Sequence, residues 1–292
     1  MQLCLSCRSE FSGDGWVCPS CGFAPEQRSG FRCFAPALAD QGGSFDVASF
    51  EGLATAEDSS FWFPPRNRLI TWALGQYFPA AASFLELGCG TGYVLSGVGR
   101  AFPHLTLTGA DIYVQGLERA RRRLPAAELI QVDGLDLPYR RQFDVAGAFD
   151  VVEHIDDDVG ALTQMKLAVK PGGGIMVIVP RHRFLWSRID DLAAHRRRYS
   201  RAMLETAARA AGLEIVRILS FAAWTLPLQM ASRILGKPKG ATLAEALELH
   251  MPAPLQRALE AVLDAERATI RAGVDYPFGA SLMLIAKRGE EK

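Results

Sequence analysis

Short apolar runs and the wider apolar spacing of helices alternate along most of the chain. Short apolar runs typical of buried strands occur at residues 84–87, 106–110, 128–132, 143–148 and 174–179, and two more at 213–219 and 280–286. Stretches such as 115–124 and 158–169 lie between them with the spacing of amphipathic helices, and a similar helix is expected at 69–78. Because this alternation builds right-handed βαβ units, it predicts an α/β, Rossmann-like, doubly wound and mostly parallel sheet of seven strands with helices on both faces.

Two regions depart from this pattern. The first forty residues hold most of the cysteines, and residues 30–44 are irregular, with Ala35-Pro36 and Gly42-Gly43, as is typical of a linker. A helical stretch at about 221–273 separates the last two predicted strands. We therefore expect a small N-terminal unit with its linker at residues 1–40, and a large domain at residues 41–292 that carries a helical insertion.

The composition is that of an ordinary globular protein. Of its 292 residues, 49% are hydrophobic and 22% charged, which argues against disordered and fibrous classes. The 32 basic and 32 acidic residues balance, which disfavours nucleic acid as a partner. Residues 1–20 contain no apolar signal segment, and the uncharged stretch at 218–232 is too short to span a bilayer. We expect a cytoplasmic protein without a transmembrane segment.

Four of the six cysteines form two C-x2-C pairs near the start of the sequence: Cys4, Cys7, Cys18 and Cys21. Two residues between cysteines let both thiolates of one turn converge on a single ion, and two such turns complete a tetrahedron. In a chain without a signal segment, two disulfides are the weaker interpretation. The spacing predicts a structural Zn²⁺ in a small zinc ribbon, and a closed site of four cysteines leaves no position open for chemistry.

A glycine-rich loop follows the first predicted strand, in the sequence Glu86-Leu-Gly-Cys-Gly-Thr-Gly92. Glycines at alternate positions let a ligand lie against the backbone where a helix begins. The dinucleotide fingerprint needs a glycine three positions after Gly90, where Tyr93 stands. The loop alone is weak evidence, so the residues that follow must decide between ligand classes.

Aspartates end three of the next strands: Asp111, Asp133 and Asp150. A carboxylate at the position of Asp111 can accept both hydroxyls of a ribose, and one at Asp133 can accept an amino group. Any one of them is most often a helix cap or a turn residue. Together they line the carboxyl edge of the sheet, where open α/β sheets bind ligands.

These motifs resemble the class I S-adenosylmethionine-dependent methyltransferases over roughly residues 60–220, and more loosely to the last strand, which in that fold inserts antiparallel near the sheet edge. The loop at 86–92 looks like their first motif, Asp111 like their ribose-binding acid, and residues 167–174 like their L-x-P-G-G turn. The resemblance implies S-adenosylmethionine as cofactor. It implies these cofactor-binding residues: Arg66, Glu86, Gly88, Cys89, Gly90, Gly92, Asp111, Ile112, Asp133, Gly134, Phe149 and Asp150.

The resemblance also implies methyl transfer, in which a hydroxyl acceptor of high pKa needs a base. We expect His154 and His195 as the catalytic residues, with the alternative that both only shape the pocket. The spacing Asp150-x-x-Glu153-His154 is similar to the E-x-x-E-H metal site of ubiquinone-pathway and small-RNA methyltransferases, but Asp150 departs from it. We therefore expect no catalytic divalent metal.

The expected function is methyl transfer to a small or lipid-linked metabolite, at oxygen. The alternative is an RNA or protein methyltransferase whose zinc ribbon binds the macromolecule, and a third is a protein that holds the cofactor without turnover. Arginines at 196–198 fit either an anionic acceptor or surface ion pairs, and the apolar stretch at 221–230 fits a lid, core or lipid-facing surface. The sequence leaves the acceptor and the oligomeric state open.

Overall fold

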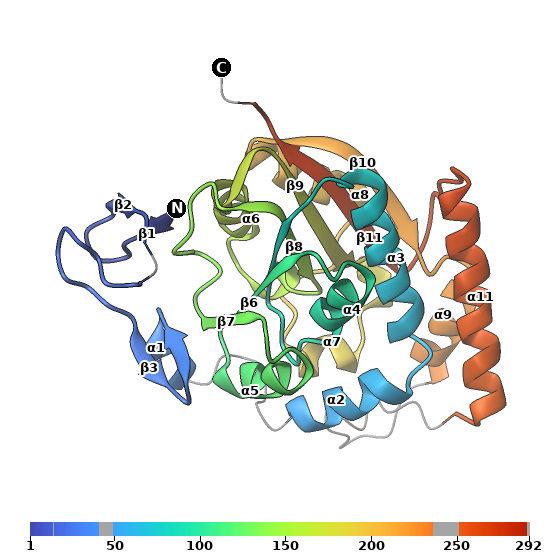
Figure 1. The fold of residues 1–292 in the computed structure, drawn as a ribbon. Helices are drawn as coiled ribbons and strands as arrows, with labels where there is room; N and C mark the ends of the chain where they lie inside the picture. Colours follow the sequence, from blue (N-terminus) through green and yellow to red (C-terminus); the bar gives the residue numbers. More distant parts are fainter. Residues whose placement is uncertain (14, 41–48, 236–250, 291–292) are drawn as a thin grey trace.

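The computed structural model describes residues 1–13, 15–40, 49–235 and 251–290, and Figure 1 shows its arrangement. The strands are β1 (Gln2–Leu3), β2 (Glu10–Phe11), β3 (Glu26–Arg28), β4 (Phe31–Cys33), β5 (Ser83–Leu87), β6 (Thr106–Asp111), β7 (Glu128–Gln131), β8 (Phe143–Phe149), β9 (Val169–Pro180), β10 (Leu213–Phe221) and β11 (Ser281–Arg288). The helices are α1 (Pro36–Asp40), α2 (Ser49–Ser59), α3 (Phe63–Tyr77), α4 (Tyr93–Ala101), α5 (Val114–Arg123), α6 (Asp158–Ala168), α7 (Arg188–Leu192), α8 (Arg201–Ala210), α9 (Leu226–Leu235) and α11 (Ala253–Arg271). Short 3₁₀ turns lie at η1 (Val152–His154) and η2 (Arg183–Leu185).

The central sheet has the order β10-β11-β9-β8-β5-β6-β7-β4-β3. Strands β5 to β9 are parallel, and β11 runs antiparallel between β9 and β10. Each of the seven strands predicted from the sequence is present, and the Rossmann-like fold with an antiparallel last strand is confirmed. The chain leaves β5 toward β6 on one side and returns to β8 on the other, so a crevice opens where these two strands end.

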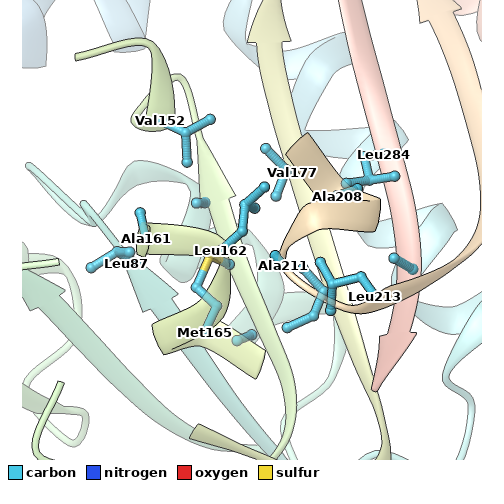
Figure 2. Packing of buried hydrophobic residues seen from close by; sticks show 14 of the residues in the cluster. Leu87, Val152, Ala161, Leu162, Met165, Val177, Ala208, Ala211, Leu213 and Leu284 are labelled. Atoms are coloured by element: carbon cyan, nitrogen blue, oxygen red, sulfur yellow. The ribbon is translucent and has the colours of Figure 1, made fainter. Parts of the chain in front are cut away.

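Helices pack on both faces of the sheet because neighbouring strand residues point to opposite sides. In β9, Val177 belongs to the core beneath α6 and α8, while Met176 and Ile178 belong to the core beneath α3, α4 and α11. Figure 2 shows the first core, where Leu162 and Met165 of α6 meet Val177 and the residues of α8. These two apolar layers fix the strand ends from which the candidate site is built.

The N-terminal segment joins the sheet, so the expectation of an irregular linker over all of 30–44 is wrong for residues 31–33, which form β4, and for residues 36–40, which form α1. Strand β4 pairs in parallel with β7, and the hairpin β3–β4 extends the sheet from seven to nine strands. Phe31 and Cys33 are buried in this pairing, and Arg32 reaches Glu128. A three-residue strand gives too short an apolar pattern to be told from a loop. Residues 41–48 lie outside the described part of the chain.

Two element boundaries differ from the prediction by more than two residues. Helix α3 begins at Phe63 instead of residue 69, because Pro64 and Pro65 occupy its first turn, where a missing N–H costs nothing. Strand β9 begins at Val169 instead of residue 174. The glycine-rich turn expected before the strand is part of it, because the register with β8 shifts between residues 143 and 145.

The helical insertion is present as α9 and α11, between β10 and β11. Its residues 236–250 are outside the described part. No helix of the described residues is both long and apolar enough to cross a membrane.

Candidate active site

A cavity of about 450 Å³ opens at the carboxyl ends of β5 and β8. This volume lies within the usual range for small-molecule sites. Its apolar wall includes Phe61, Trp62, Phe63, Leu228 and Met251, and its polar wall includes Arg66, Glu86, Asp150, Glu153, His154 and His195. The segments before α3, after β5 and β8, and from the insertion thus converge on one space.

The glycine-rich loop forms one side of this cavity, and its backbone requires glycine. Gly88, Gly90 and Gly92 have φ angles of 68°, 50° and 76°, in the left-handed region. A Cβ atom at Gly88 would lie 2.4 Å from Cγ2 of Val151, so a side chain there would clash with the segment after β8. Of the described residues, a Cβ at Gly90 would meet only Phe50, at 3.9 Å, which leaves that peptide open to a ligand.

Asp111 holds the loop from the end of β6. Its Oδ2 accepts a hydrogen bond from Gly90 N at 2.7 Å, and its Oδ1 accepts one from Tyr113 N at 2.9 Å. Burial raises the pKa of Asp111 to about 6, although these backbone hydrogen bonds act in the opposite direction. Each carboxylate oxygen keeps a second lone pair with which it can accept a hydroxyl.

Glu86 and Arg66 leave buried polar atoms without a partner. Glu86 is buried at the end of β5, and in the part of the chain that the structure describes its Oε2 has no hydrogen-bond partner. Burial raises the pKa of Glu86 well above the ordinary value. The Nε of Arg66 is likewise buried and unpartnered, while its Nη2 donates to Asp150 Oδ2 at 2.5 Å. Asp150 itself has a φ of 59°, a strained conformation that is concentrated at functional sites. Such atoms fit a ligand that carries an ammonium and a carboxylate.

Glu153, His154 and His195 form a second polar group across the cavity. Their ligating atoms all lie within 4.8 Å of one another, and the two imidazole rings meet edge-on with centroids 4.7 Å apart. Glu153 is fully buried, and neither of its carboxylate oxygens has a hydrogen-bond partner among the described residues. Burial raises the pKa of Glu153 well above the ordinary value. Burial, followed by the neighbouring His195, lowers the pKa of His154 to about 4, so that this ring is neutral at pH 7.

Asp190 orients His195. Its Oδ1 lies 2.9 Å from Nδ1 of His195, and its carboxylate also accepts from Arg198 Nε at 2.6 Å. Burial would raise the pKa of Asp190, but the hydrogen bonds from His195 and Arg198 outweigh it and lower that pKa. The backbone N–H of Arg196 donates to Glu153 O, which fixes this segment against η1. With Nδ1 facing a carboxylate, Nε2 of His195 points toward Glu153 Oε1 at 3.9 Å.

The structure brings most of the sequence-predicted site residues to the cavity, but not all of them. Five lie outside its wall, one in the loop after β5 and four at the ends of β6 and β7: Gly92, Asp111, Ile112, Asp133 and Gly134. Cys89 lies in the wall as part of the glycine loop, where burial raises the pKa of its thiol well above the ordinary value.

Of the two alternatives for Arg198, the ion pair is present, but its pair with Asp190 is buried and does not lie on the surface. Sequence reasoning missed the roles of two other residues of the site. Glu57 of α2 was not expected in the cavity wall, where it bonds Thr91 Oγ1 and Arg123. Glu153 had been considered only as a metal ligand. The one sequence signal for it was its place beside His154.

The four N-terminal cysteines lie close together. The Sγ atoms of Cys4 and Cys21 are 3.6 Å apart, those of Cys7 and Cys18 are 3.7 Å apart, and all four lie within 4.8 Å of one another. A tetrahedral zinc with Zn–S bonds of about 2.3 Å needs sulfur–sulfur distances of about 3.8 Å. The cysteines therefore fit a zinc ion.

Comparisons with known proteins agree with the fold. A family model described as a methyltransferase domain matches residues 57–218, more than half of the chain. Among curated relatives, the trans-aconitate 2-methyltransferase of Azoarcus sp. is 29% identical over 148 residues, which is 49% of this chain and 54% of that protein. The fatty-acid O-methyltransferase of Mycolicibacterium smegmatis is 31% identical over 143 residues, 46% of this chain and 48% of that protein. The chain thus spans about half the length of these relatives.

Solved structures show the same fold at lower identity. Phosphoethanolamine N-methyltransferase 2 of Haemonchus contortus superimposes with a TM-score of 0.57 at 15% identity, covering 87% of this chain and 60% of that one. A methyltransferase in complex with the Haloferax volcanii Trm112 activator reaches 0.54 at 18% identity, covering 84% and 96%. The family match, the strand order and the glycine loop lead to one conclusion: the chain belongs to the class I S-adenosylmethionine-dependent methyltransferases.

Proposed function

We propose that the protein transfers a methyl group from S-adenosylmethionine to an oxygen atom of a small or lipid-linked metabolite. The observation that carries this proposal is the fully buried carboxylate of Glu153, which has no partner among the described residues and lies beside His195 in the cavity at the expected cofactor loop. Buried polar groups without partners are rare in native proteins, and they indicate a ligand that completes them.

The cofactor would be held by residues on both sides of the glycine loop. Glu86 accepts the ammonium of its methionine part, Arg66 donates to the carboxylate, and the peptides at Gly88, Cys89, Gly90 and Gly92 let it lie against the backbone. Asp111 accepts the ribose hydroxyls, with Ile112, Asp133 and Gly134 on the adenine side and Phe149 and Asp150 near the reacting end. When bound, the sulfonium supplies a methyl group that is already electrophilic.

His195 is proposed as the base. Because Asp190 accepts from Nδ1, the neutral ring has its lone pair on Nε2, which faces the cavity. This nitrogen takes the proton of the acceptor hydroxyl as the oxygen attacks the methyl carbon and the carbon–sulfur bond breaks. Neutral His154 packs against His195, where it keeps the ring in place and bonds the acceptor.

The acceptor is proposed from the cavity and the relatives. The wall contributed by Phe61, Trp62 and Phe63 suits an apolar body, while the His195–Glu153 side suits a hydroxyl or carboxyl group. Relatives with 29% and 31% identity are named ubiquinone biosynthesis O-methyltransferase, from Escherichia coli, and fatty-acid O-methyltransferase. Both names describe methylation at oxygen, which is the reaction that a base in this position serves.

The test is transfer of a labelled methyl group into separated small-molecule, lipid, RNA and protein fractions of a cell extract. We expect label in the small-molecule or lipid fraction with the native protein and none with His195→Ala. Label in RNA or protein would instead support a macromolecular acceptor. No label in any fraction, with cofactor binding intact, would support a binding protein without turnover.

We propose no catalytic divalent metal. Asp150, the third member of the metal pattern considered from the sequence, pairs with Arg66, and His195 takes its place beside Glu153 and His154. Activity should therefore persist in the presence of a chelator. The chelator concentration is chosen so that elemental analysis still finds the zinc of the four cysteines. Activity that is lost under this condition and restored by Mg²⁺ would show that Glu153, His154 and His195 hold a divalent ion.

The four cysteines are proposed to hold one structural zinc per chain. Elemental analysis of freshly purified protein should find close to one zinc, and Cys18→Ser should release it. The absence of zinc from the native protein would contradict this assignment.

A further inference from the structure

We propose that the N-terminal ribbon clamps the two loops that form the adenosine side of the cofactor site, so that Arg8 and Asp136 act as positioning residues for S-adenosylmethionine binding. This inference rests on the proposed function, and it gives the zinc ribbon a role inside the chain. The observations that carry it are the contacts between residues 1–35 and the segments that follow β6 and β7.

The segment after β7 is the first point of contact. It runs without helix or strand from residue 132 to 142 and contains the expected adenine-side turn at Asp133 and Gly134. Within that turn, Leu135 N donates to Asp133 Oδ1 at 2.9 Å and Asp136 N donates to Asp133 O at 3.0 Å. The position of Asp136 therefore helps to set the position of Asp133.

The ribbon binds this segment through a bidentate salt bridge between Arg8 and Asp136. Nη1 and Nη2 of Arg8 donate to the two carboxylate oxygens of Asp136 at 2.5 and 2.9 Å. A bidentate pair of this kind fixes the orientation of the two side chains as well as their distance. Arg8 directly follows Cys7, and its backbone N–H donates to Cys4 O. The turn that would hold zinc therefore also sets the position of the Arg8 guanidinium.

Backbone and ring contacts extend the grip. Leu3 N donates to Pro138 O, and Gln2 forms an isolated bridge with Tyr139. The ring of Trp16 packs edge-on against Tyr139, with centroids 5.5 Å apart. Figure 1 shows β1 and β2, in dark blue, beside the green segment that follows β7. The ribbon thus faces this segment along much of its length.

Gln131 provides a second route, to the ribose side. Its side chain is fully buried at the end of β7, where Oε1 accepts from Ala35 N at 3.1 Å and Nε2 donates to Ala35 O at 2.9 Å. The same Nε2 donates to Ile112 O at 3.1 Å, directly after Asp111. The segment that follows β4 is therefore bonded through one side chain to the loop expected beside the ribose.

These contacts predict that loss of the ribbon's geometry weakens cofactor binding while the cavity around His195 is unchanged. The Arg8–Asp136 pair is partly exposed, with 57% and 32% of the side chains accessible, so its own contribution is small. We expect Arg8→Ala to raise the Kd for S-adenosylmethionine by about two- to fivefold. Zinc-free Cys18→Ser disturbs all the contacts at once, and should raise it by about tenfold or more.

The test is calorimetric titration of S-adenosylmethionine into the full chain and its variants. The swapped pair Arg8→Asp with Asp136→Arg should restore most of the affinity lost in Arg8→Ala. The matched control is Arg209→Ala, which removes an exposed arginine paired with Glu205 on α8. Hydrogen exchange provides a separate readout: residues 133–141 should exchange faster in Arg8→Ala, with no change at η1 or α7.

The outcomes separate this proposal from the proposed function. If the native protein does not bind S-adenosylmethionine, the proposed function fails. If it binds, and Arg8→Ala and zinc-free Cys18→Ser bind equally well, the clamp is wrong and the methyltransferase assignment stands. A weakened Arg8→Ala that the swapped pair does not restore would also overturn the clamp, because the effect would then not depend on this ion pair.

Discussion

The wall of the cavity and the interface of the ribbon use the same kinds of side chain in opposite ways. At the interface, Arg8 pairs with Asp136 and Arg141 with Glu10, and all four side chains are partly exposed. In the cavity wall, Glu86, Glu153 and Arg66 keep four buried polar atoms without a partner. Of the eight such atoms among the described residues, only one, Gln2 Oε1, belongs to the ribbon.

The difference indicates what each region is for. Polar groups that are satisfied within the chain hold its parts together, and each exposed pair adds little free energy. Buried groups left unsatisfied lower the stability of the ligand-free protein, and they are retained where a ligand completes them. The comparison predicts large effects on function and gains in stability from substitutions in the cavity, and small effects of either kind from the interface.

The largest effect should come from His195. If it is the base, His195→Ala should lower kcat by about 10²- to 10⁴-fold and remove the acidic limb of the pH–rate profile. If His154 and His195 only shape the cavity, the substitutions should mainly raise KM, and the pH profile should keep its form. Steady-state kinetics across pH on His195→Ala and His154→Ala would distinguish the two roles.

The next largest effect should come from Asp111. Asp111→Ala removes the charged acceptor expected for the ribose hydroxyls, and should weaken S-adenosylmethionine binding by about 1–3 kcal/mol. The native protein should also bind more weakly as the pH falls through about 6, where this carboxyl takes up its proton. Calorimetry from pH 5 to pH 8 on both proteins checks this, and a pH dependence unchanged in Asp111→Ala would contradict it.

Glu153→Gln should stabilise the folded chain while impairing catalysis. Removing a buried, unpartnered charge should raise the free energy of unfolding by about 1–2 kcal/mol at pH 8. Because the folded pKa of Glu153 is raised, the protonated native side chain carries no such cost at low pH, so the gain should disappear toward pH 4. Urea unfolding at both pH values measures it. The matched control, exposed Glu205→Gln on α8, should show no gain, and a Glu153→Gln protein less stable than the native one would contradict the comparison.

The smallest effect should come from the interface pair of Glu10 and Arg141. Both side chains are about one-third exposed, so Glu10→Gln should change the free energy of unfolding by less than about 1 kcal/mol. The same urea measurements apply. A loss of several kcal/mol would show that the interface contributes strongly to the stability of the fold. The contrast between a weakly stabilising interface and the cavity would then be wrong.

The main fold was predictable because each strand is long enough to show its period. The strands from residue 83 to 180 are five to twelve residues long except β7, which has four. Strand β4 has only three residues, and its pairing with β7 depends on a contact almost a hundred positions away. No local pattern carries that information, so the extension of the sheet could be learned only from the structure.

The site was predictable where it follows strand ends and unpredictable where it depends on folding between distant segments. Glu86, Asp111 and Asp150 could be placed because parallel strands end at one edge. The approach of His195 to Glu153 joins segments more than thirty residues apart, and the bond from Asp190 to His195 lies in a loop with no periodic pattern. Burial decides the rest: the sequence shows that residue 153 is glutamate, but not that both of its oxygens lack a partner.

The most direct test of the central claim is a calorimetric titration of the native protein with S-adenosylmethionine, alongside NAD and alongside Glu86→Gln. The account predicts one cofactor bound per chain, no measurable binding of NAD, and weaker binding of S-adenosylmethionine to Glu86→Gln, because an amide cannot replace the carboxylate that meets the ammonium. Tighter binding of NAD than of S-adenosylmethionine, or equal binding to the native protein and Glu86→Gln, would contradict it.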